Sequence, residues 1–355
     1  MRKLAAALAA AILVTGCADL SGTPGAASPA ATPTTTTAPA TPGSAPGLEL
    51  EQTYERVISQ VLPSIVQITT PTGLGSGVVY DDKGHIVTNA HVIGEATEMQ
   101  VTLATGGGSR TARLVESFPI GDLAVIKVED PRTLRPAKFG DSSKLRVGQL
   151  VLAMGNPLGL SGSVTNGIVS ATGRTVTEPQ DEGSPGATIT SAIQTSAAIN
   201  PGNSGGALVD MSGHVIGIPT LAATNPSLGG GAAPGIGFAI PSNVATDIAS
   251  QIVQHGRVIN SHRAALGIVG STVIGDDGAP AGVGVRSVQR GGGAAKAGIR
   301  EGDVILSVAG TPTPTIADLT ELLTQYKPGD KVEVEFARGG QTRKVTATLS
   351  ELKGE

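Results

Sequence analysis

Three short motifs in a fixed order constrain this chain of 355 residues more than any other feature. His91 ends the motif Thr-Asn-Ala-His after an apolar run, Asp122 lies at the start of another apolar run, and Ser204 lies in the glycine-rich segment Gly-Asn-Ser-Gly-Gly. A serine hydroxyl is a weak nucleophile until an imidazole accepts its proton, and the imidazole needs a buried carboxylate to fix its tautomer. We therefore expect a fold that brings His91, Asp122 and Ser204 together as a catalytic triad.

The glycines around Ser204 predict a second part of the same site. The carbonyl oxygen under attack becomes an oxyanion, which backbone N–H groups stabilise where glycine lets the chain turn tightly. We therefore predict an oxyanion hole at Gly202, Asn203 and Ser204. A chain with 50 glycines can contain such a pentapeptide by chance, but three motifs in catalytic order favour an active site over a structural role.

Further stretches make the chain resemble the trypsin-like serine proteases of the HtrA (DegP-like) group, whose His–Asp–Ser order is that of chymotrypsin. The resemblance runs from about Thr53 to about Leu349, and its matching stretches are Gly75–Val79, Thr88–Val92, Asp122–Val125, Gly155–Pro157, Gln194–Gly206 and Gly237–Ser242. It implies a mainly β fold, in which a chymotrypsin/trypsin-like double β-barrel is followed by an α+β PDZ domain. One departure is visible, because members of the group usually carry Asp where this chain has Ser196.

The resemblance also implies a function. It is that of a serine endopeptidase of the bacterial cell envelope that cleaves unfolded or misfolded proteins, with a PDZ domain that binds peptide C-termini and regulates activity. It suggests a homotrimer as well. An alternative from another class is a non-catalytic envelope chaperone or PDZ peptide-binding protein, and the complete triad favours the enzyme.

Charge and composition bound the other partners. The formal net charge of −4, without a basic cluster, argues against nucleic acid as the main partner. The five histidines are scattered and there is a single cysteine, so no paired spacing suits a metal. We expect no cofactor and no metal.

The specificity pocket is predicted at Ala198, where the resemblance places the floor of the pocket for the residue before the scissile bond. A small apolar floor cannot neutralise a buried charge. Small or medium aliphatic residues are therefore the expected choice at that position.

The N-terminus has the pattern of a targeting segment. Arg2 and Lys3 precede the apolar run Leu4–Val14, which is too short for an ordinary spanning helix, and Val14-Thr15-Gly16-Cys17 looks like a bacterial lipobox. We predict a lipoprotein signal peptide over residues 1–17 and lipidation of Cys17, which anchors the protein to the outer face of the cytoplasmic membrane. The alternative is an ordinary signal peptide with an incidental cysteine.

The remaining chain divides by composition into a tether and two domains. Residues 18–47 are rich in Ala, Pro and Thr and predict a disordered tether. A helix with Tyr54, Val57, Ile58 and Val61 at helical spacing opens the predicted protease domain, residues 48–258. Strands are expected at 64–69, 77–80, 85–89, 99–103 and 124–128 in a first barrel, and at 150–153, 167–171, 189–194, 207–209, 215–219 and 237–240 in a second. A helix at 243–255 closes the domain.

Residues 259–355 are the predicted PDZ domain. Thr315 and Asp318 form a capping box for a helix over 316–326. A PDZ domain binds an extended peptide beside a strand and such a helix, with its carboxylate in a loop of backbone N–H groups. The predicted loop is Ala265, Leu266, Gly267 and Ile268, and the predicted groove residues are Leu319, Leu322 and Leu323. The leucines could equally fill the core, because such a helix must bury one face.

Overall fold

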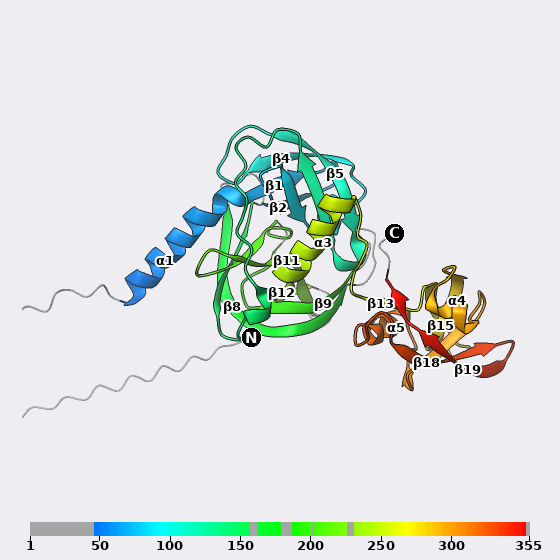
Figure 1. Cartoon of the computed structure of the whole chain (residues 1–355). Coiled ribbons are helices and arrows are strands. Elements are labelled where there is room, and N and C mark those ends of the chain that lie inside the picture. Colours follow the sequence, from blue (N-terminus) through cyan, green and yellow to red (C-terminus); the bar gives the residue numbers. More distant parts are fainter. Residues whose placement is uncertain (1–45, 157–161, 179–186, 201, 226–230, 353–355) are drawn as a thin grey trace, which may run out of the picture. The chain divides into compact units, whose positions relative to one another are not determined.

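The computed structural model describes residues 46–156, 162–178, 187–200, 202–225 and 231–352 (Figure 1). The predicted signal peptide, Cys17 and most of the predicted tether lie outside these residues. Helix α1 (Pro46–Val61) opens the described part, so the last two residues of the predicted tether are helical. Proline suits a helix start, because its fixed φ and missing N–H cost nothing in the first turn. Val57 and Val61 of α1 are buried in the protease core.

Six antiparallel strands form a first closed barrel in the order β1-β2-β3-β6-β5-β4. They are β1 (Ile65–Thr69), β2 (Leu74–Val79), β3 (His85–Thr88), β4 (Glu98–Leu103), β5 (Arg110–Phe118) and β6 (Leu123–Val128). The barrel interior is packed with Val, Ile, Leu and Ala, and Gly77 permits close packing, since a Cβ there would lie 2.6 Å from Ile86 Cγ2. Strand β5 was not predicted, because its alternating Arg, Thr and Glu residues give a weak apolar pattern and its pairing with β4 and β6 sets its conformation.

A second closed barrel follows in the order β10-β11-β12-β9-β8-β7. Its strands are β7 (Leu150–Gly155), β8 (Ser163–Glu178), β9 (Ala187–Thr195), β10 (Ala207–Asp210), β11 (Val215–Asn225) and β12 (Gly231–Pro241). The short helix η1 (Leu62–Ser64) joins α1 to β1. Three others, α2 (Ala90–Ile93), η2 (Pro119–Gly121) and η3 (Ser142–Lys144), lie between the strands of this domain. Helix α3 (Ser242–His255) then packs Ile248 and Ile252 into the core and ends at Gly256, whose positive φ of 70° suits glycine.

The C-terminal domain has a six-stranded sheet. Five of its strands follow the order β14-β15-β16-β18-β19, and β17 pairs with β16; β13 and β20 form a separate small sheet. Its elements are β13 (Ala264–Ala265), β14 (Ile268–Ile274), β15 (Pro280–Val288), α4 (Gly293–Ala297), β16 (Val304–Val308), β17 (Thr311–Pro312), α5 (Ile316–Leu323), β18 (Lys331–Arg338), β19 (Gln341–Thr348) and β20 (Ser350–Glu351). The predicted capping box at Thr315 and Asp318 is confirmed, with both reciprocal hydrogen bonds formed. Helix α5 ends at Leu323 instead of Tyr326, because the next residues turn with N–H bonds to carbonyls three positions back.

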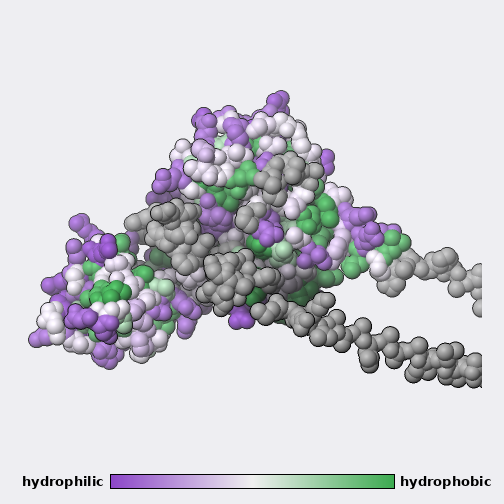
Figure 2. Space-filling model, turned by 180° about the vertical axis from the view of Figure 1, so that it is seen from behind, coloured by the Kyte–Doolittle hydropathy of each residue, from purple (hydrophilic) through white to green (hydrophobic). Residues whose placement is uncertain are grey.

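Surface polarity is mixed over both domains. Figure 2 shows hydrophilic and hydrophobic residues interspersed on the face that it presents. Val147, Val269 and Ile274 are among the large apolar side chains left exposed, which is ordinary for single surface residues. Among the helices of the described residues, none is long and apolar enough to cross a membrane. The two closed barrels and the C-terminal sheet confirm the mainly β class predicted from sequence.

Candidate active site

The protease domain brings His91 and Asp122 into direct contact. The imidazole Nδ1 of His91 lies 2.9 Å from Asp122 Oδ2, and the His91 backbone N–H donates to Asp122 Oδ1 at 3.0 Å. Because a carboxylate oxygen is an acceptor, this contact favours the imidazole tautomer with its proton on Nδ1, which leaves Nε2 as the acceptor nitrogen. Asn89, just before α2, donates its Nδ2 to the Asp122 carbonyl at 2.9 Å and ties the two segments together.

Asp122 is buried and is held by the local backbone. It is 1% exposed and has a left-handed φ of 51°, directly after η2, with its N–H bonded to the Pro119 carbonyl. Left-handed backbone is uncommon outside glycine, although Asp tolerates it better than most residues. Strained conformations of this kind cluster at functional sites, where surrounding contacts maintain them.

Thr220 connects Asp122 to Ser204, and it was not predicted from the sequence. Its Oγ1 donates a hydrogen bond to Asp122 Oδ2, and its backbone carbonyl accepts one from Ser204 Oγ at 3.1 Å. Thr220 is 3% exposed in β11. The only sequence signal was a polar residue directly after the apolar run 215–219, and many strand ends share that pattern.

The loop before β10 carries Ser204 in a tight turn. Gly205 has a φ of 79°, and its N–H donates to the Pro219 carbonyl at 2.9 Å. A Cβ at Gly205 would lie 2.3 Å from the Ser76 carbonyl oxygen, so only glycine fits this position. Gly202 also has a positive φ, 112°. The glycines that suggested a tight turn in the sequence therefore do form one.

The three residues of the predicted oxyanion hole differ in their contacts. The Asn203 N–H donates to the Asn200 carbonyl at 3.1 Å and is used within the turn. The Asn203 side chain also holds the loop, because Nδ2 donates to the Ala198 carbonyl and Oδ1 accepts from the Asn200 N–H. Asn203 is thus a loop-shaping residue, which leaves the N–H groups of Gly202 and Ser204 as the candidate donors.

Ala198 lies beside this loop, with its surface exposed. Its carbonyl accepts from Thr165 Oγ1 at 2.8 Å as well as from Asn203. The neighbouring Ile199 is buried against Gly237, where a Cβ would lie 2.4 Å from Ile199 Cγ1. Ser196, at the position of the noted departure, accepts the Ile168 N–H on its hydroxyl at 3.0 Å.

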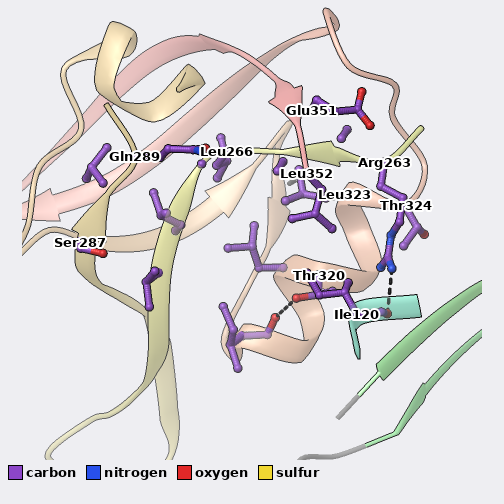
Figure 3. A pocket seen from close by; sticks show the side chains of 18 residues that line it. Ile120, Arg263, Leu266, Ser287, Gln289, Thr320, Leu323, Thr324, Glu351 and Leu352 are labelled. Carbon is purple, nitrogen blue, oxygen red and sulfur yellow. Dashed lines mark hydrogen bonds between the residues drawn. The ribbon is translucent and has the colours of Figure 1, made fainter. Parts of the chain in front are cut away.

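A pocket in the PDZ-like domain contains most of the predicted groove. Ala265, Leu266, Gly267 and Ile268 line it, and so do Leu319 and Leu323. Figure 3 shows the strand after Leu266 on one side and helix α5 on the other. Leu322 does not appear among the lining residues and is 6% exposed in the core of this domain. Of the three leucines, Leu319 and Leu323 thus line the groove, whereas Leu322 is a core residue.

No group of three or more His, Cys, Asp or Glu side chains within the described residues is arranged to hold a metal ion. The buried acid Asp303 has a different partner, because Arg338 donates two hydrogen bonds to its carboxylate. Burial alone would raise the pKa of Asp303, but the hydrogen bonds and charge of Arg338 and the Arg300 N–H hold it below the ordinary value.

Comparisons with known proteins agree with this geometry. A trypsin-like peptidase domain model matches residues 75–218, and a PDZ domain model matches residues 256–349. The periplasmic pH-dependent serine endoprotease DegQ of Escherichia coli is 37% identical over 311 residues, which are 85% of this chain and 65% of DegQ. The periplasmic serine endoprotease DegP of Escherichia coli is 41% identical over 285 residues, 78% of this chain and 57% of DegP.

Solved structures match over nearly their whole length. A serine endoprotease from Yersinia pestis has a TM-score of 0.56 and 36% identity, covering 84% of this chain and 98% of that one. The HtrA-type protease AlgW with a tripeptide gives the same TM-score and identity, covering 85% of this chain and 98% of AlgW. The chain spans less than two thirds of the length of DegQ and DegP. By domain content, identity and fold, the chain belongs to the HtrA-type serine proteases, with a trypsin-like peptidase domain followed by a PDZ domain.

Proposed function

We propose that this protein is a serine endopeptidase of the bacterial cell envelope that cleaves unfolded or misfolded proteins. Ser204 is the nucleophile, His91 the general base and Asp122 the residue that orients and stabilises the imidazole. One observation carries the proposal: the buried Asp122 carboxylate accepts both the imidazole and the backbone N–H of His91, while Thr220 contacts Asp122 and Ser204 together.

The chemistry follows from these contacts. Ser204 Oγ attacks the scissile carbonyl carbon as His91 Nε2 takes the hydroxyl proton, and the carbonyl oxygen becomes an oxyanion between the N–H groups of Gly202 and Ser204. The imidazolium returns the proton to the leaving amine, and the C–N bond breaks to give an acyl-enzyme. A water molecule then gives a proton to His91 and attacks the ester, which releases the new carboxyl end and restores Ser204. No step requires a cofactor.

Substrate choice has two proposed sources. Ala198, beside the oxyanion loop, favours a small or medium aliphatic residue before the scissile bond. The PDZ pocket between the 265–268 segment and α5 takes an extended C-terminal peptide with apolar side chains, since leucines and Ile268 line it. Binding there is proposed to regulate the protease by favouring its competent state.

The cellular location is proposed from two lines of support. The relatives DegQ and DegP carry the word periplasmic in their names. Cys17, the only cysteine in the chain, follows an apolar leader. We propose that it carries a lipid that anchors the protein to the outer face of the cytoplasmic membrane. Replacing Cys17→Ser should move the protein to the soluble fraction with its protease activity intact, and unchanged membrane association would contradict the anchor.

Two further points complete the proposal. A homotrimer, suggested by the family resemblance, is tested by the mass of the purified protein in solution. The alternative of a non-catalytic chaperone is not favoured, because a chaperone has no need of a buried carboxylate paired with a histidine at this serine.

The test of the function is cleavage of unfolded casein by the purified full chain. The wild-type protein should digest casein, and Ser204→Ala should lose on the order of 10⁶ in turnover. Ser212→Ala, at an exposed serine in the turn after β10, is the matched control and should retain full activity. Casein digestion by Ser204→Ala at the wild-type rate would overturn the assignment.

A further inference from the structure

Ser76 in β2 reaches from the first barrel to the loop that carries Ser204. It is 0% exposed. Its hydroxyl donates to the Gly202 carbonyl and accepts the Asn156 N–H at 2.8 Å. Its backbone N–H donates to the Ser204 carbonyl at 3.0 Å. One buried residue thus holds the carbonyls of both Gly202 and Ser204.

These two contacts hold the peptide planes on either side of the Ser204 N–H. A peptide unit is planar, so fixing a carbonyl also fixes the N–H of the next residue. The planes that follow Gly202 and Ser204 are held by Ser76. The Ser204 N–H lies on the plane between them, whose Asn203 carbonyl accepts the Gly206 N–H at 3.0 Å. The Asn203 N–H and side chain close the same turn through Asn200 and Ala198. The orientation of the whole loop therefore depends on Ser76 from one side and on Asn203 from the other.

Gly202 is the reason that an external anchor is needed. Its φ of 112° lies in a region that glycine enters freely, and glycine has many other conformations available. Without a donor at its oxygen, the Gly202 carbonyl can turn toward the place where the oxyanion develops. A carbonyl dipole facing that charge would oppose the transition state instead of stabilising it.

We propose that Ser76 is a positioning residue that locks the oxyanion loop in its productive orientation through its hydroxyl. The proposal rests on the proposed function, because it assigns Ser76 to the oxyanion hole of that same site. Ser76 touches no reacting atom and acts through Gly202. The contact also makes the catalytic loop of the second barrel depend on a strand of the first.

The test compares Ser76→Ala with Ser242→Ala. Ser242 is also 0% exposed, and its hydroxyl donates to the Gly140 carbonyl at 2.7 Å, at the start of α3. The two variants lose the same group from equally buried sites, but only Ser76 contacts the loop. Each is assayed for kcat and KM on a chromogenic peptide, for thermal unfolding, and for affinity for a peptide boronate, whose tetrahedral adduct places an oxygen in the oxyanion hole.

Ser76→Ala should lower kcat about 10- to 100-fold with KM nearly unchanged, somewhat less than the loss of a direct oxyanion donor. Boronate affinity should fall by a similar factor. Ser242→Ala should keep wild-type kcat and boronate affinity, even if its unfolding temperature drops. The proposal is overturned by a kcat of Ser76→Ala within twofold of wild type, by a kcat loss without a loss of boronate affinity, or by equal losses in Ser242→Ala.

A second variant covers the case in which Ser76→Ala does not fold. Ser76→Cys keeps a side chain of the same shape in place, but its thiol is larger than the hydroxyl and donates only weakly, so it should lower kcat in the same direction without changing KM. Wild-type kcat in Ser76→Cys would then overturn the proposal. Wild-type enzyme and Ser204→Ala serve as controls that separate this outcome from a failure of the proposed function. If the wild-type chain neither cleaves the peptide nor binds the boronate through Ser204, the proposed protease activity is itself refuted.

Discussion

The catalytic site and the PDZ pocket are built on opposite physical principles. At the catalytic site, the Asp122 carboxylate has specific polar partners, His91 and Thr220. In the PDZ pocket, apolar side chains such as Leu319 and Leu323 form a surface beside a strand. The catalytic site therefore depends on single atoms, and the pocket on collective shape. Single substitutions should have large effects in the first and small effects in the second.

Among the residues that support Ser204, the largest effect is expected from Asp122→Asn. An amide can donate to Nδ1 and stabilise the wrong imidazole tautomer, so kcat should fall on the order of 10⁴-fold, a magnitude taken from the trypsin-like example. Peptide hydrolysis measured at saturating substrate gives kcat directly. A loss of less than tenfold would mean that the carboxylate contacts are structural. The catalytic site would then not depend on single atoms more than the PDZ pocket does.

Residue chemistry explains which parts of the site could be predicted. Histidine, aspartate and serine in catalytic order have few other uses together, so a triad could be predicted residue by residue. Thr220 and Ser76 were not, because their roles come from contacts between strands far apart in the sequence. Leu319, Leu322 and Leu323 share one helical face, and sequence periodicity cannot separate groove from core within it. Strand β5 was not predicted either, because its neighbouring strands determine its pairing.

The ion pair of Asp303 and Arg338 in the PDZ domain tests whether single polar atoms also matter outside the catalytic site. Because the pKa of Asp303 is below its ordinary value, its ionisation stabilises the fold above the unfolded-state pKa, and this contribution is lost as the pH falls through the folded-state pKa. Asp303→Asn should cost roughly 2 kcal/mol at pH 7, less than a fully buried pair since Arg338 is partly exposed.

The difference between Asp303→Asn and wild type should therefore shrink as the pH falls below about 4. Urea denaturation followed by hydrogen exchange of peptides covering β18 measures it for this domain. A stability difference that stays constant from pH 7 to pH 3 would show that the carboxylate charge does not act as described. Activity on short peptides should be unchanged in Asp303→Asn, because this ion pair lies in the PDZ domain and not at the catalytic site.

Thr220→Val removes one donor to Asp122 and keeps the backbone carbonyl that contacts Ser204. Valine matches threonine in shape, so the loss isolates one hydrogen bond to a charged group, worth about 1.5 kcal/mol or about tenfold in kcat. A kcat about tenfold lower, with an unchanged KM, would show that the Thr220 hydroxyl supports catalysis through Asp122. An unaltered kcat would assign Thr220 to the scaffold alone.

The smallest effects are expected in the PDZ pocket, where Leu319→Ala and Leu322→Ala form a matched pair. Both leucines are buried on α5, but only Leu319 lines the pocket. Leu319→Ala should weaken binding of an apolar C-terminal peptide about fivefold, roughly the contribution of partial apolar contact. Leu322→Ala should lower stability and leave the affinity of the folded protein unchanged. Fluorescence anisotropy measures the peptide affinity of both variants. Equal losses of affinity would show that the groove and core roles of these leucines cannot be separated.

The most direct test of the central claim is covalent labelling of the intact protein with a fluorophosphonate, read by mass spectrometry of its peptides. A serine activated by a paired histidine reacts, whereas an ordinary serine does not. The account predicts stoichiometric labelling at Ser204 in the wild type, and none in Ser204→Ala or His91→Ala. Absence of label in the folded wild-type chain, with or without an added C-terminal peptide, or label on another serine, would contradict it.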